Sequence, residues 1–105
     1  MKFSDYQQAS ARTLNRAVAT NEALTNYALG IAGETGEVVE MVKKHVFHGK
    51  AMNLADVEKE LGDVLWYVAA VASTLGLDLT AIAQRNVDKL KTRYPDGFVE
   101  GGGIR

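Results

Sequence analysis

Proline occurs only once in the 105-residue chain, at Pro95. It is the residue that most reliably ends or kinks a helix, because its ring removes a backbone donor and clashes with the preceding turn. The 94 residues before Pro95 therefore contain no obligatory helix break. Apolar residues recur among them at spacings of three and four, which is the period of amphipathic helices. The sequence predicts an all-α fold.

Four helices are expected from this periodicity, with short loops between them. Their predicted spans are about 4–18, 21–47, 53 or 54 to 75, and 78 or 79 to 94. Short loops make consecutive helices antiparallel neighbours, so we expect an antiparallel four-helix bundle. We assign residues 1–95 to a single helical domain and residues 96–105, which include three consecutive glycines, to a flexible C-terminal tail.

The charge and composition exclude several classes of protein. Twelve basic and thirteen acidic residues give a net charge of −1, which lacks the basic excess of a nucleic-acid-binding protein. There is no cysteine, so disulfides, thiolate metal sites and cysteine nucleophiles are excluded. The longest apolar run, residues 64–72, is about half of a membrane span. With a polar N-terminus that lacks a signal peptide, we expect a cytoplasmic protein that binds neither nucleic acid nor membrane.

Two helices share an internal pattern. Glu34-Thr-Gly-Glu37-Val-Val and Glu60-Leu-Gly-Asp63-Val-Leu both read Glu, any residue, Gly, acid, Val, aliphatic. A glycine inside a helix costs about 1 kcal/mol relative to alanine. Its presence at the same offset in both helices indicates close helix approach or room for a ligand.

The acidic residues lie beside the apolar stripes and not opposite them, because residues three and four apart share a helix face. The expected core stripes are Ile31, Val38, Val42 and Val46 on one helix, and Val57, Val64, Val68 and Leu75 on the other. Antiparallel packing of these stripes would bring four carboxylates to one place: Glu34, Glu37, Glu60 and Asp63.

Four clustered anions repel one another, and a hard cation among them would remove the repulsion. Ligation by oxygen alone favours Mg²⁺ or Mn²⁺ over zinc or iron. A di-iron bundle would need Glu-x-x-His pairs, and neither His45 nor His48 follows a glutamate at that spacing.

The last helix carries the opposite charge. Asn86, Lys89 and Arg93 are three and four residues apart and border an apolar stripe. Facing an acidic metal site, Lys89 and Arg93 would hold phosphate groups, and Asn86 could recognise a base or a sugar.

Glu34-x-x-Glu37, 22 further residues and Glu60-x-x-Asp63 together resemble the signature of MazG-like nucleoside triphosphate pyrophosphohydrolases, which belong to the all-α NTP pyrophosphatase superfamily. The segments 59–68 and 86–98 are also similar to that family, and the resemblance extends over residues 27–98.

This resemblance implies a Mg²⁺-dependent enzyme, with Mn²⁺ as a substitute, that splits an NTP or dNTP into the monophosphate and pyrophosphate. It implies that Glu34, Glu37, Glu60 and Asp63 hold the metal, with Glu37 also activating the attacking water. It implies that the substrate contacts Tyr67, Asn86, Lys89 and Arg93. It also implies a homo-oligomer, a dimer or a tetramer.

The third expected helix favours association on its own evidence. Residues 64–72 are apolar on all sides, and a single four-helix chain would cover only part of them. We therefore expect oligomerisation to complete the bundle, with Trp66, on the face away from the core stripe, at the centre of the contact.

A non-catalytic helical module that binds nucleotide or another protein is the alternative function. The sequence leaves open the base and sugar preference, the number of metal ions, dimer or tetramer, and a house-cleaning or a pool-control role.

Overall fold

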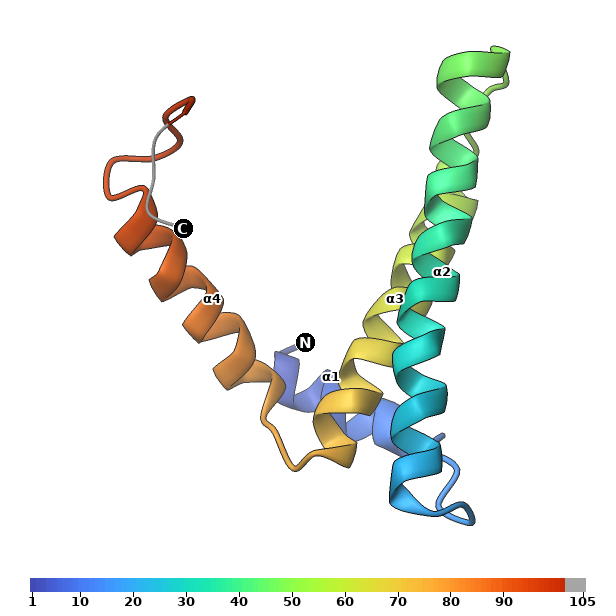
Figure 1. The fold of residues 1–105 in the computed structure, drawn as a ribbon, viewed down its shortest axis with the longest axis vertical. Helices are drawn as coiled ribbons and strands as arrows, with labels where there is room; N and C mark the ends of the chain where they lie inside the picture. Colours follow the sequence, from blue (N-terminus) through green and yellow to red (C-terminus); the bar gives the residue numbers. More distant parts are fainter. Residues whose placement is uncertain (102–105) are drawn as a thin grey trace.

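The computed structural model describes residues 1–101, which form four α-helices and no strand (Figure 1). The helices are α1 (Phe3–Ala11), α2 (Thr20–His48), α3 (Leu54–Thr74) and α4 (Leu79–Arg93). The prediction of an all-α fold of four helices is therefore confirmed. Of the predicted tail, residues 102–105 lie outside the described part of the chain.

Side-chain caps set the starts of two helices. The Asn53 side chain accepts hydrogen bonds from the backbone N–H groups of Ala55 and Asp56, and Asp78 accepts one from Thr80. Such caps satisfy N–H groups that have no partner within the helix. At the C-terminal end of α2, Gly49 takes a left-handed conformation with φ of 64°, which favours glycine.

The first helix ends at Ala11, seven residues before its predicted end at Val18. The Asn15 side chain accepts a hydrogen bond from the Ala17 N–H at 3.0 Å, and the Asn15 N–H donates to the Tyr27 hydroxyl at 3.2 Å. Asparagine offers the backbone this alternative to helical bonding, so the helical pattern is interrupted where α1 turns toward α2.

The two long helices, α2 and α3, form an antiparallel hairpin, and α1 packs across the C-terminal half of α3 (Figure 1). The side chain of Gln7 fixes α1 in this position. Its amide nitrogen donates to Ser73 Oγ at 3.1 Å and to the Leu77 carbonyl at 2.9 Å, and its oxygen accepts from the Leu79 N–H at 2.8 Å. One side chain thus joins α1 to the end of α3, to the loop and to the start of α4.

The fourth helix does not lie along the hairpin. It bends away from α3 by 107° and packs against α1, so its far end diverges from α2 and α3 (Figure 1). Within one chain the four helices therefore do not close into a bundle.

Among the described residues no single helix is long and apolar enough to cross a membrane, although the bent pair of α3 and α4 together would meet that test by length and composition.

The core is small and aromatic. Tyr27 and Ala70 are buried at its centre, and Trp66 packs edge-on against Tyr27 with ring centroids 5.6 Å apart. The Trp66 indole N–H donates to Thr13 Oγ1 at 2.8 Å. Trp66 thus packs on the core of its own chain, and the prediction that it lies on the face away from that core is wrong. Its place in a subunit contact stays a prediction.

The predicted apolar stripes are buried only in part. Ile31, Val38, Val57, Val64 and Val68 are half-buried. Val42, Val46 and Leu75 are exposed, with 42%, 61% and 51% of their surface accessible. The predicted stripes are therefore covered only in part. The buried residues of the hairpin are Ala23, Tyr27, Ala69, Ala70 and Ala72, which lie outside the predicted stripes, toward the start of α2 and the end of α3.

Close approach of α2 and α3 occurs at Gly30. A Cβ atom there would overlap the ring of Tyr67 on α3, so the ring occupies the space that glycine leaves. The two glycines singled out by the sequence pattern, Gly36 and Gly62, differ from Gly30 in this respect. A Cβ atom added to either of them would meet no described neighbour within 4 Å. They do not mark a close approach of helices within the described chain.

We predict opposite effects for alanine at two glycines of α2. Gly30→Ala should lower the free energy of unfolding by about 1–3 kcal/mol, because the Tyr67 ring must move. Gly33→Ala meets no neighbour and should raise it by up to about 1 kcal/mol through helix propensity. Urea denaturation of both variants measures the difference. Equal effects of the two substitutions would contradict the contact between Gly30 and Tyr67.

Removal of the Gln7 amide should loosen α1 and α4 together. Gln7→Leu leaves the Leu79 N–H without its partner and should lower the free energy of unfolding by about 1–3 kcal/mol. Gln8→Leu, on the exposed side of the same helix, is the matched control and should stay within about 0.5 kcal/mol. Hydrogen exchange of the Leu79 amide should be faster in Gln7→Leu only.

Candidate metal centre

Three carboxylates from two helices meet in the middle of the hairpin. Glu34 on α2 and Glu60 and Asp63 on α3 each offer an oxygen, and these oxygens lie within 4.8 Å of one another. Glu60 and Asp63 share a face because they are three residues apart on one helix. All three side chains are half-buried, as expected for residues that border the apolar stripes.

The fourth predicted carboxylate, Glu37, does not join this group. It is exposed, and its oxygens are not among those that converge. The negative charge of Glu37 nevertheless contributes to the raised pKa of Glu34. Glu37 therefore lies at the edge of the acidic group, and its role with the attacking water stays a prediction.

Repulsion within the group changes the titration of Glu34. Its pKa is raised from 4.5 to about 7, first by a hydrogen bond to Glu60, then by desolvation and by the negative charges of Glu60, Asp63 and Glu37. Two carboxyl groups can share a hydrogen bond only when one of them holds a proton. Below about pH 7, a proton on Glu34 therefore allows the two carboxyl groups to lie in contact without a cation.

Glu60 also supplies the observation that tests whether a cation fits. Its Oε2 atom is buried and accepts no hydrogen bond from any described residue. A buried oxygen without a donor is costly. Three convergent carboxylates, one of them with a buried oxygen that lacks a donor, match the oxygen ligands that Mg²⁺ and Mn²⁺ prefer.

The predicted phosphate-binding residues lie elsewhere in the chain. Asn86 and Lys89 are exposed on α4 and Arg93 is half-buried at its end. Because α4 bends away from the hairpin, these residues do not face the acidic group of their own chain (Figure 1). Their contact with substrate stays a prediction.

Tyr67 lies one turn beyond Asp63, as the sequence spacing requires. Its ring packs on Gly30 and stands edge-on to Trp66, with centroids 5.1 Å apart. Tyr67 thus has a structural role in the hairpin, and its predicted contact with a nucleotide is not tested by this arrangement.

Tyr6, on α1, was missed by the sequence analysis. It is half-buried, and both burial and the negative charge of Asp63 raise the pKa of its hydroxyl. A phenol that Asp63 perturbs belongs to the surroundings of the acidic group. Helical periodicity could not predict this position of Tyr6, because it does not show which residue of α1 faces α3.

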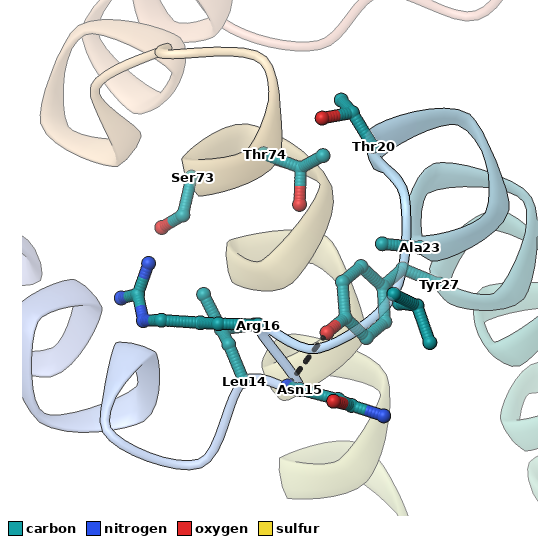
Figure 2. Close-up of a pocket in the computed structure, with 9 residues that line it drawn as sticks. Leu14, Asn15, Arg16, Thr20, Ala23, Tyr27, Ser73 and Thr74 are labelled. Carbon is teal, nitrogen blue, oxygen red and sulfur yellow. Dashed lines mark hydrogen bonds between the residues drawn. The ribbon is translucent and has the colours of Figure 1, made fainter.

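A separate pocket of about 310 Å³ lies at the end of the hairpin that is far from the α2–α3 loop, where α2 begins and α3 ends (Figure 2). Arg16, Tyr27, Ser73 and Thr74 are among its lining residues, and none of the converging carboxylates is. Figure 2 shows the hydrogen bond between Asn15 and the Tyr27 hydroxyl inside it. This pocket contains no group of the candidate metal centre.

Glu34 should make the stability of the metal-free protein depend on pH. Its pKa is higher in the folded protein, so its proton stabilises the fold fully below about pH 4.5, and this contribution is lost as the pH rises through about 7. In EDTA, Glu34→Gln should therefore melt at a higher temperature than the unmodified protein at pH 8, with a smaller difference at pH 5. Glu58→Gln, an exposed glutamate of α3, is the control and should show no such trend.

Comparisons with known proteins give a family for this arrangement. The MazG nucleotide pyrophosphohydrolase domain matches residues 20–98, which include all three converging carboxylates. The chain is also 38% identical over 86 residues to the Gene 37 protein of Mycobacterium phage L5, covering 78% of this chain and 75% of the phage protein. No solved structure gives a significant match. With this extent of matching, the chain belongs to the MazG nucleotide pyrophosphohydrolase family.

Proposed function

We propose that this protein hydrolyses nucleoside triphosphates to the monophosphate and pyrophosphate in a Mg²⁺-dependent reaction, with Mn²⁺ as a substitute. The observation that carries the proposal is the convergence of the Glu34, Glu60 and Asp63 carboxylates, one of which, Glu60, also has a buried oxygen that lacks a donor. The family match supports the nucleotide substrate and the class of bond that is cleaved.

In this proposal Glu34, Glu60 and Asp63 would hold Mg²⁺, which neutralises phosphate oxygens and lowers the pKa of a bound water when present. Glu37, exposed at the edge of the group, orients the attacking water and accepts its proton. The water oxygen bonds to the α-phosphorus as the bond to the bridging oxygen breaks, and pyrophosphate leaves. No side-chain nucleophile is needed, in keeping with the absence of cysteine.

The basic residues of α4 require a second copy of the chain in this proposal. A folded protein of 11.4 kDa has an accessible surface of about 5,800 Å², whereas this chain exposes 7887 Å². Its radius of gyration is 16.7 Å, against about 13 Å for a compact chain of this length. We propose a homo-oligomer, dimer or tetramer, that covers this surface and brings Lys89 and Arg93 of one copy to the acidic group of another.

Pyrophosphate release from a panel of NTPs and dNTPs tests the reaction. Release should require Mg²⁺ or Mn²⁺ and stop in EDTA. Asp63→Asn should lower turnover by about 100-fold or more while the protein stays folded, because the variant keeps the shape of the side chain and removes its charge. The exposed Glu58→Gln is the control and should retain activity.

Glu37→Gln separates two roles of that residue. A loss of turnover with unchanged metal affinity would support its role with the water. Activity equal to the unmodified protein would remove Glu37 from the site. No release from any nucleotide by a folded oligomer would contradict the proposed reaction and favour a binding module.

A further inference from the structure

The pocket of about 310 Å³ in Figure 2 is separate from the candidate metal centre. Three segments line it: the connection from α1 to α2, the first two turns of α2 and the last turn of α3. Tyr27 lines the pocket seven residues before Glu34, which corresponds to about 10 Å along α2. The family match begins at residue 20, so it assigns nothing to the connection between α1 and α2.

The pocket contains a positive charge and no negative one. Among the described residues that line it, Arg16 alone is charged. Its guanidinium group forms no ion pair or hydrogen bond with any residue in the described range 1–101. The sequence from Tyr6 to Asn21 also contains no acidic residue. Because the planar guanidinium fork fits the oxygens of a carboxylate or a phosphate, Arg16 is able to bind an anion that enters the pocket.

Two hydroxyl groups of the pocket wall also have a hydrogen to donate. The Tyr27 hydroxyl accepts a hydrogen bond from the Asn15 N–H at 3.2 Å and donates to no described residue. Tyr27 is only 8% exposed, and a buried donor without an acceptor is costly. Ser73 Oγ accepts from the Gln7 amide at 3.1 Å and likewise donates to no residue in the described chain. Both hydroxyl hydrogens are therefore available to an acceptor in the pocket.

The three donor groups come from three different segments and border one space. In Figure 2 the Arg16 side chain extends toward the side of the pocket where Ser73 lies, and the Tyr27 hydroxyl points toward the connection that carries Arg16. Ligand sites usually have volumes of about 300–1,000 Å³, so a pocket of about 310 Å³ favours a small ligand.

We propose that this pocket binds a small oxyanion, whose phosphate or carboxylate group is held by the Arg16 guanidinium and by the hydroxyls of Tyr27 and Ser73. Hydrogen bonds to a charged group are about twice as strong as those between neutral groups. The site goes beyond the proposed function, because it shares no residue with the three carboxylates and needs no metal ion. A bound anion joins the connection to both α2 and α3, and it stabilises the folded chain by mass action.

Calorimetry in EDTA tests the pocket while the candidate metal centre holds no cation. The probes are inorganic phosphate, pyrophosphate and malonate, each titrated at an ionic strength matched with sodium chloride. We expect saturable binding of at least one probe. Binding of the phosphates without malonate would identify a phosphate ligand, and the reverse would identify a carboxylate. Saturable binding of none of the three would overturn the proposal.

Arg16→Gln removes the charge of the pocket, and Arg12→Gln is its matched control. Arg12 is exposed in the same connection but does not line the pocket. Arg16→Gln should weaken binding of the probe by about 10- to 100-fold, and Arg12→Gln by less than about 2-fold. Equal weakening by the two substitutions would assign the binding to the general charge of the connection and overturn the site.

Tyr27→Phe tests the buried donor, because it keeps the ring and removes the hydroxyl. In a variant shown by circular dichroism to be folded, binding should be weaker by about 10-fold. Unchanged affinity would remove the Tyr27 hydroxyl from the site and overturn the proposed ligand set. Should Tyr27→Phe fail to fold, Arg16→Gln decides, because it replaces an exposed side chain.

Amide chemical shifts locate the bound anion within the chain. Titration of the unmodified protein with the same probe in EDTA should move the amide signals of Arg16, Tyr27 and Ser73 with one common affinity. Signals that move around Glu34 and Asp63 instead would place the anion at the acidic group and overturn the proposal.

Discussion

The two helices outside the hairpin, α1 and α4, are joined to its end by one side chain, Gln7. Its amide bonds to the end of α3, to the Leu77 carbonyl and to the first N–H of α4. An amide can donate and accept at once, so a single residue of this type can satisfy groups from three segments. The bonds of Gln7 fix where α1 lies on α3.

The candidate metal centre lowers the stability of the folded chain when no metal is bound. Three carboxylates are held together by the packing of α2 against α3, and the charges of their neighbours raise the pKa of Glu34. Clustered charges of one sign destabilise a fold unless protons or cations neutralise them. Retention of such a cluster in the middle of a small hairpin is understandable if its ligand is a cation.

Helical periodicity was sufficient for the number of helices and for the face that Glu60 and Asp63 share on α3, because those features depend on spacing along one helix. Periodicity gave wrong predictions where contacts between residues far apart in the sequence determine the structure. Trp66 was expected to face away from the core, yet the segment around Thr13 contacts it, and that segment departs from the helix predicted there. The direction of α4 and the contact of Tyr6 with its surroundings depend on the Gln7 bonds, which no local pattern encodes.

The contact between Gly30 and Tyr67 lies one helical turn from Glu34 on α2 and one turn from Asp63 on α3. Its consequence concerns the axial register of the hairpin. Each residue of slip between two helices moves their side chains by about 1.5 Å, enough to spoil a set of ligand distances. The Tyr67 ring fits only over glycine, so it resists such sliding. The segments of α2 and α3 that carry the ligands therefore also fix the axial alignment of those ligands.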